Sequence, residues 1–91
     1  MTDVSKEKLD RFFALYTQML DNATRSHPEE YALVVRTGVE EVSRRMRIAV
    51  ERGSWNHDGR AFKATCKALG IKHTRKAIKA FLFDGEDTEP A

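Results

Sequence analysis

The sequence contains little cysteine or proline and no long apolar run. Among its 91 residues there are one cysteine and two prolines. A single cysteine cannot form an intrachain disulfide, so a disulfide-stabilised secreted domain is not expected. No apolar run approaches the roughly 20 residues that a helix needs to cross a bilayer, and no segment has the pattern of a secretory signal. We therefore expect a cytoplasmic protein that makes no contact with a membrane.

Other features that enzymes and metal proteins need are also missing. A chain of 91 residues forms one domain with a small core and leaves no cleft between domains. No glycine-rich loop follows a strand pattern, and the neighbouring His57 and Asp58 do not by themselves make a catalytic pair. Zinc commonly needs four ligands, and no zinc-finger spacing connects the available candidates, which are Cys66, His27, His57 and His73. We expect neither enzymatic activity nor a cofactor or metal.

The charge that is present is unevenly distributed along the chain. Residues 1 to 41 contain five basic and eight acidic side chains, and residues 81 to 91 contain four acidic ones. Residues 42 to 80 between them have 11 basic side chains and only two acidic ones, a net charge of +9. Such a block attracts polyanions, of which nucleic acid is the most abundant in a cell. The alternative interpretation is a solvated lysine-rich face that only keeps the protein soluble.

Apolar residues recur at helical spacing in the first half of the chain. One helix is predicted over residues 5 to 23, with Asp3 or Ser5 at its start and an inward stripe. Ser26 and Glu29 have the spacing of a capping box around Pro28, which predicts that a second helix begins there and ends at Gly53. That helix either continues through Gly38 or divides there. The two predicted inward stripes are Leu9, Phe12, Phe13, Tyr16, Met19 and Leu20, then Tyr31, Val35, Val39, Val42, Met46, Ala49 and Val50.

The second half contains two shorter helical patterns after a loop over residues 53 to 59. Asn56 or Asp58 is expected to cap a helix that ends at Gly70, and Thr74 to cap the next. Their inward residues are Phe62, Cys66, Leu69, Ala77, Ile78, Phe81 and Leu82. The fold class is therefore all-α, a small bundle of four or five helices in one domain over residues 1 to 83. Residues 5 to 53 form its N-terminal helices and 58 to 83 a basic hairpin, followed by an acidic tail over 84 to 91.

Residues 60 to 82 resemble a generic helix-turn-helix DNA-binding motif. The small residue Cys66 precedes the turn glycine, Gly70, by four positions, and the apolar Ile71 follows it. The sequence departs from the common pattern six residues after the glycine, where Lys76 replaces a branched apolar residue, and Ile78 comes two residues later. The resemblance implies that the second helix contacts duplex DNA.

Basic residues lie away from the apolar stripes of both C-terminal helices, since residues three and four apart share a helix face. Arg75 is predicted at the groove, because its fork matches a guanine edge or a phosphate, with His73 beside it. The residues predicted to contact phosphates are Lys63, Lys67, Lys72, Lys76 and Lys79, with Arg60 on the same face. Three arginines of the preceding helix are candidate nucleic-acid contacts of lower rank: Arg44, Arg45 and Arg47. Glu40, Glu41 and Glu51 are placed to pair with some of them.

Trp55 leaves two interpretations open: it stacks on an unpaired base, or it covers the end of the core. The predicted function is a small nucleic-acid-binding regulator or accessory factor of bacterial or phage type, with DNA favoured over RNA. The alternative is a protein-interaction module, an inhibitor or assembly subunit, whose basic face docks on an acidic protein or ribonucleoprotein. A homodimer also stays open, because the stripe from Tyr31 to Val50 is long enough for a partner helix.

Overall fold

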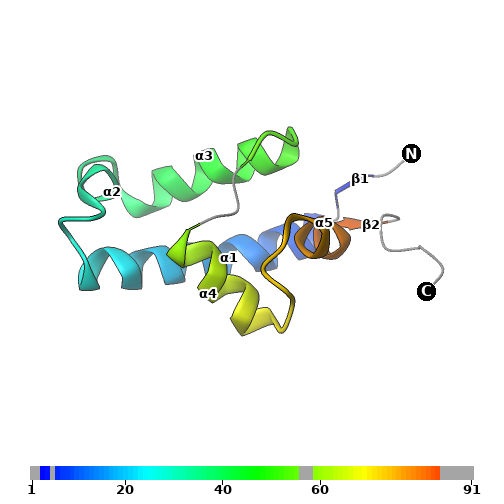
Figure 1. Ribbon diagram of the computed structural model, residues 1–91. Helices are drawn as coiled ribbons and strands as arrows, with labels where there is room; N and C mark the ends of the chain where they lie inside the picture. The colour runs from blue at the N-terminus through cyan, green and yellow to red at the C-terminus, as the bar shows by residue number, and fades with distance from the viewer. Residues whose placement is uncertain (1–2, 5, 56–58, 85–91) are drawn as a thin grey trace.

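The helices predicted from the apolar spacing are present in the structure. A computed structural model describes residues 3–4, 6–55 and 59–84, and within these ranges the all-α prediction is confirmed, with five helices. Figure 1 shows them with a pair of two-residue strands where the ends of the chain meet. In chain order the elements are β1 (Asp3–Val4), α1 (Lys6–Ser26), α2 (Ala32–Thr37), α3 (Val39–Glu51), α4 (Arg60–Leu69), α5 (Arg75–Leu82) and β2 (Phe83–Asp84).

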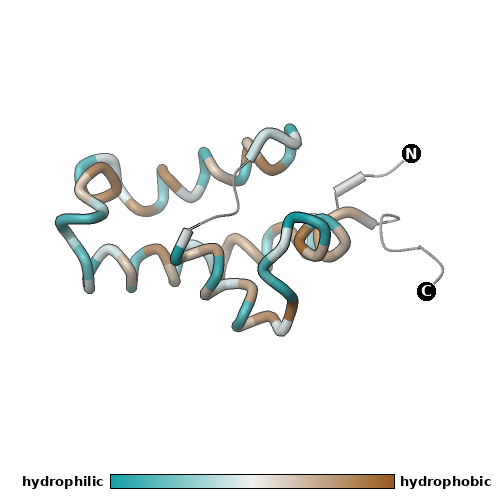
Figure 2. Tube along the Cα trace, in the orientation of Figure 1, coloured by the Kyte–Doolittle hydropathy of each residue, from teal (hydrophilic) through white to brown (hydrophobic). Residues whose placement is uncertain are grey.

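Helix α1 is the element on which the others assemble. Helices α3 and α4 make their main contacts with it, and α5 contacts it to a smaller extent. In Figure 1, α3 runs alongside α1 and α4 crosses it, and in Figure 2 brown hydrophobic segments alternate with teal ones along each helix. The predicted inward stripe of α1 is buried except for Met19, which is partly buried. Apolar residues at three- and four-residue spacing thus form the centre of the core.

The boundary between α1 and α2 differs from the prediction. Ser26 is the last residue of α1 and not the cap of the next helix, and α2 begins only at Ala32. A capping residue needs a non-helical backbone, so Ser26 cannot cap while it continues α1. The helix also extends three residues past Ala23. Thr24 in this last turn is buried, and its hydroxyl donates to the carbonyl of Leu20 at 2.7 Å.

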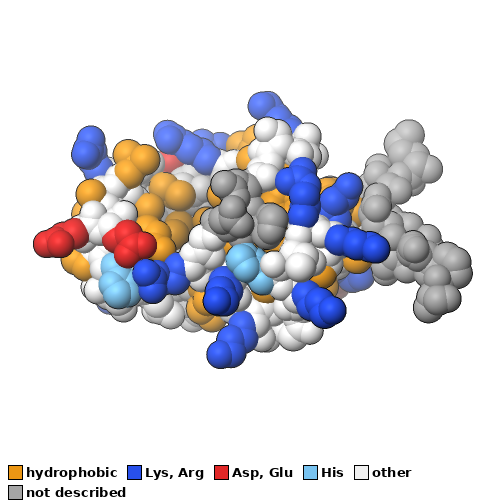
Figure 3. Space-filling model, in the orientation of Figure 1, with side chains coloured by type: hydrophobic (Ala, Val, Ile, Leu, Met, Phe, Trp, Pro, Cys, Tyr) orange, Lys and Arg blue, Asp and Glu red, His pale blue; other side chains and the backbone are white. Residues whose placement is uncertain are grey.

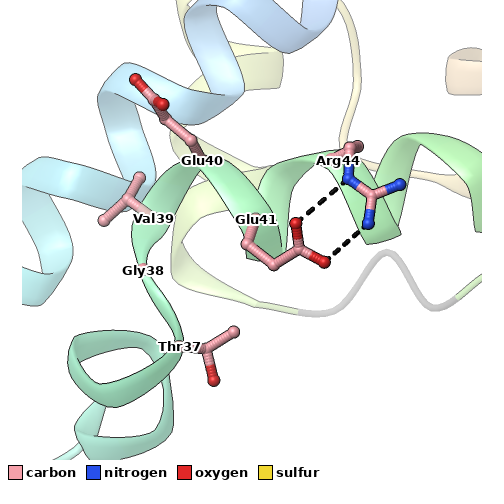
Figure 4. Close-up of a pocket in the computed structure, with 6 residues that line it drawn as sticks. All are labelled: Thr37, Gly38, Val39, Glu40, Glu41 and Arg44. Carbon is pink, nitrogen blue, oxygen red and sulfur yellow. Dashed lines mark hydrogen bonds and ion pairs between the residues drawn. The ribbon is translucent and has the colours of Figure 1, made fainter.

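Gly38 divides the second predicted helix in two, which is one of the two alternatives that the sequence left open. Its φ of 104° and ψ of 134° interrupt the helical path between α2 and α3. No side chain caps the first turn of α3. Figure 4 shows the Thr37 side chain pointing away from the first turn of α3.

Two glycines end helices as predicted. Gly70 follows α4 with a φ of 74°, in the left-handed region. Its amide donates to the carbonyl of Lys67 at 3.2 Å, and the amide of Ile71 donates to that of Cys66 at 3.0 Å. This pair of bonds is a Schellman motif, and an equivalent pair follows α3 around Gly53. The expected caps of α4, Asn56 and Asp58, lie outside the described residues.

The stripe predicted for α2 and α3 is only partly buried. Val50 is fully buried, whereas Val39, Val42, Met46 and Ala49 are half-buried. The prediction for Val35 is wrong: it is 58% exposed, and Leu33 beside it is 67% exposed. The six-residue α2 packs mainly on α1 and α3, and none of its residues is fully buried.

The two ends of the described chain are joined by backbone pairing. Asp3 pairs with Asp84 and Val4 with Phe83 in an antiparallel register. The backbone pairing therefore includes Asp84, the first residue of the segment predicted as a tail, and residues 85 to 91 lie outside the described part. Among the described residues, no helix has the length and apolar character that crossing a membrane requires.

Candidate nucleic-acid interface

Five lysines from the two C-terminal helices and the turn between them lie at the surface. Four are exposed and Lys79 is half-buried. None of the carboxylates that the structure describes lies within ion-pair distance of these ammonium groups. In Figure 3, Lys and Arg side chains cover the face over α4 and α5, while most of the acidic side chains in view gather at the other end, near α2. We call this set the lysine surface: Lys63, Lys67, Lys72, Lys76 and Lys79.

The opposite faces of both helices hold the lysine surface in place. On α4, Phe62, Thr65 and Cys66 are at most 2% exposed, and the Thr65 hydroxyl donates to the carbonyl of Ala61 at 2.7 Å. On α5, Ile78 and Leu82 are completely buried. Because one face of each helix is fixed in the core, the lysines on the other face point outward.

Thr74 caps α5 as predicted. Its side-chain oxygen accepts a hydrogen bond from the amide of Ala77 at 3.1 Å, and its backbone is extended. The cap makes Arg75 the first residue of α5. The turn from Gly70 to Thr74 separates two helices that contact each other little, since α4 packs chiefly on α1.

The structure places Arg75 differently from the groove position predicted for it. Its guanidinium donates from Nη1 to the carbonyl of Trp55 and from Nη2 to that of Gly53, each at 2.9 Å. The same group lies over the Trp55 ring, 4.8 Å from its centroid. Both terminal nitrogens of the fork predicted to bind a guanine edge or a phosphate are thus engaged with the loop after α3, while the residue as a whole is exposed.

Trp55 covers the end of the core, the second of its two predicted interpretations. The residue is 8% exposed, and its ring stacks on Phe62 with centroids 5.6 Å apart and planes 20° apart. Phe62 in turn contacts Phe12 and Tyr16 of α1, with centroids 5.3 and 5.2 Å away. Burial in this cluster also raises the pKa of Tyr16 to about 12. A buried indole offers no face to an unpaired base, so the base-stacking interpretation of Trp55 is wrong.

The arginines of α3 are engaged with carboxylates, as the spacing of Glu41 suggested. Arg44 and Arg45 pair with Glu41 at 2.7 and 2.9 Å, and Arg47 pairs with Asp10 of α1. Figure 4 shows the two bonds between Arg44 and Glu41. Hydrogen bonds from Arg44 and Arg45 lower the pKa of Glu41 to about 2. Arg44 and Arg45 share one carboxylate, so the three arginines meet two carboxylates and their charge is only partly balanced. Because each of them has a carboxylate partner, we keep them separate from the lysine surface.

Arg60 is also drawn away from the lysine surface. Its guanidinium pairs with Glu30, in the turn before α2, at 3.3 Å. Hydrogen bonding to the Tyr31 side chain, and then to Glu30, raises the pKa of Arg60. The arginine predicted on the same face as Lys63 therefore connects α4 to the turn between α1 and α2.

His73 and Lys8 complete the surroundings. His73, predicted beside the groove, is half-buried in the turn before α5. The Lys8 ammonium of α1 lies 5.8 Å from the centroid of the Phe81 ring on α5, so a basic side chain of the N-terminal block contacts the last helix. Sequence reasoning missed Lys8 because no spacing rule connects positions so far apart in the chain.

Cys66 is buried in the core and has a structural role. It is 1% exposed on the inward face of α4, and burial raises the pKa of its thiol. A buried thiol with a raised pKa is a poor nucleophile. Within the described residues, no three histidine, cysteine or acidic side chains gather where they could hold a metal ion.

Comparison with models of protein families, with curated protein sequences and with solved structures finds no match to this chain. The interpretation of the site therefore depends on its own charges and geometry. Of the residues predicted to bind nucleic acid, the structure leaves the five lysines outward-facing. It gives internal partners to the five arginines and buries Trp55.

Proposed function

We propose that the chain binds nucleic acid, with duplex DNA favoured, through the lysine surface. The observation that carries the proposal is the set of five surface lysines on two consecutive helices, with no ion-pair partner among the described carboxylates. Ammonium groups act as point charges toward phosphate oxygens, and each contact releases counterions from the nucleic acid. A small protein with such a surface gains affinity from the backbone alone.

The proposed contacts recognise phosphates and not bases. Reading a guanine requires a bidentate arginine or a well-placed lysine, and the arginine expected there, Arg75, is bound to two backbone carbonyls. In helix-turn-helix proteins the first residues of the second helix contact base edges, so the position of Arg75 does not support that role for α5. We therefore propose an accessory factor with weak sequence preference.

The same geometry favours a duplex over a single strand. Proteins that bind single strands stack bases on exposed aromatic rings, and the one tryptophan is buried against Phe62. A duplex presents two rows of phosphates that lysines can follow without such rings. RNA single strands, with their splayed bases, are correspondingly disfavoured.

The experiment is a titration of a labelled duplex by fluorescence anisotropy at several salt concentrations. If all five lysines contact phosphates, the logarithm of the association constant falls with the logarithm of salt concentration at a slope of about −4.5, from about −0.9 for each contact. Two duplexes of unrelated sequence are expected to bind within a small factor of each other. A flat salt response would exclude the proposal.

Matched variants connect the binding to the lysine surface. Replacing Lys63 or Lys67 by glutamine is expected to weaken binding to both duplexes equally. Each substitution should also reduce the steepness of the salt dependence by about 0.9. The control is Arg36→Gln, which removes one positive charge from the exposed side of α2. A loss in the control as large as in the α4 variants would show that only net charge matters.

A further inference from the structure

Helix α5 is fixed in the core through Ile78 and Leu82, whereas the residues of its first turn, Arg75 and Lys76, are exposed. The helix has eight residues, contacts α1 only to a small extent, and makes few contacts with α4. Yet it carries Lys76 and Lys79, while Lys63 and Lys67 are on α4. If the lysines are to follow one nucleic-acid backbone, something must hold the two helices in a fixed relation.

Arg75 supplies that connection at the first residue of α5. Its two hydrogen bonds of 2.9 Å reach the carbonyls of Gly53 and Trp55, at the start of the loop that follows α3. The Trp55 ring, over which the guanidinium lies, stacks in turn on Phe62 of α4. A continuous series of contacts therefore joins the start of α5 to the buried face of α4.

The chemistry of the contact is specific to arginine. A positive side chain in the first turn of a helix is disfavoured by the helix dipole, and α5 has no acidic residue there. The carbonyl oxygens of Gly53 and Trp55 offset this unfavourable interaction by accepting charge-assisted hydrogen bonds from the guanidinium. The planar guanidinium reaches both oxygens while it lies over the Trp55 ring. A lysine keeps the charge but cannot reproduce two parallel bonds and a stacked plane.

We propose that Arg75 is a positioning residue: by joining α5 to Gly53 and Trp55 it keeps Lys76 and Lys79 aligned with the lysines of α4. The proposal rests on the nucleic-acid binding proposed above and assigns to Arg75 a role other than contact with the ligand. It also explains why an arginine within the basic block faces the protein.

The test compares Arg75→Lys and Arg75→Gln with the double variant Lys76→Gln/Lys79→Gln, in the full chain, by anisotropy with the labelled duplex against salt. Both Arg75 variants are expected to lose affinity about as much as the double variant, with the slope reduced by about 1.8, the value for two contacts. Hydrogen exchange supplies a second measurement. The amides of α5 are expected to exchange faster in both Arg75 variants and at the wild-type rate in the double variant.

The opposite pattern would overturn the positioning role. If Arg75 contacts phosphate directly, Arg75→Lys binds like the wild type, while Arg75→Gln reduces the steepness of the salt dependence by about 0.9. Unchanged exchange of the α5 amides in Arg75→Lys would equally contradict the proposal. Failure of the proposed function looks different, because the wild-type chain itself would then show no salt-dependent binding.

Discussion

Phe62 is the residue at which the core and the candidate interface meet. Its ring contacts Phe12, Tyr16 and Trp55, and it is 2% exposed. Phe62→Ala is expected to lower the free energy of unfolding by about 3–5 kcal/mol through lost burial and a cavity. That is a large part of the roughly 5–15 kcal/mol available to a domain. Urea denaturation measures the loss.

The matched control for Phe62 is Leu33, an apolar side chain outside the core. Leu33 is 67% exposed on α2, so Leu33→Ala is expected to change the free energy of unfolding by no more than about 0.5 kcal/mol. Comparable losses in the two variants would mean that α2 is covered by something that this structure does not contain.

Glu41 gives the stability a pH dependence of known sign. Hydrogen bonds from Arg44 and Arg45 lower its pKa from 4.5 to about 2 in the folded protein. A lowered folded pKa stabilises the protein above the unfolded value, and that contribution disappears as the pH falls from 4.5 through about 2. Thermal unfolding of Glu41→Gln should therefore differ from the wild type at pH 6 and converge with it toward pH 2.

Glu40 is the control for this prediction. It occupies the same first turn of α3 and experiences the same helix dipole, but forms no ion pair with a described residue. Glu40→Gln is expected to show a smaller difference from the wild type across the same pH range. If the two variants behave alike, the dipole and not the arginines accounts for the effect.

At the scale of elements, the cap of α5 has a matched pair in the same chain. Thr74 accepts a hydrogen bond from Ala77, whereas Thr37 precedes α3 without capping it. Thr74→Ala is expected to lower the free energy of unfolding by about 1 kcal/mol, because the cap is lost. Thr74→Ser keeps a hydroxyl cap and is expected to retain most of that stability. Thr37→Ala should leave the urea midpoint nearly unchanged. The reverse order would mean that α5 does not depend on its cap.

The elements that sequence reasoning predicted correctly are those with local signals. Gly53, Gly70 and Thr74 determine helix ends through bonds within a few residues, so spacing alone finds them. The start predicted at Ser26 is wrong because a capping box competes there with continuation of α1, whose last turns bury Ala23 and Thr24. Local patterns cannot decide between two locally acceptable structures.

The candidate site divides in the same way. Helical periodicity was sufficient to place Lys63, Lys67 and Lys76 on outward faces, because burial of the opposite face follows from the same stripe. The partners of Arg60 and Arg75 lie 30 and about 20 residues away, and one of those contacts is to backbone carbonyls that every residue possesses. Only the assembled fold reveals that these arginines are occupied.

At the scale of the whole molecule, the basic side chains separate into paired and unpaired groups. Arg44 and Arg45 share Glu41, and Arg47 and Arg60 each pair with one carboxylate, whereas the lysine surface has no described counter-charge. Like charges three or four residues apart, such as Lys63 and Lys67, destabilise a helix slightly. The lysine surface is thus expected to reduce the stability of the free protein.

Replacing the lysine surface by glutamine tests that expectation together with the proposed function. The variant with all five lysines changed should unfold at the same or a higher urea concentration than the wild type at low salt, and the difference should shrink as salt screens the repulsion. Duplex binding should be lost. The matched control, Arg44→Gln with Arg45→Gln, removes paired charges from α3 and should retain binding without gaining stability. If the lysine variant instead unfolded earlier, these side chains would be holding the fold together, and their exposure would no longer point to a ligand.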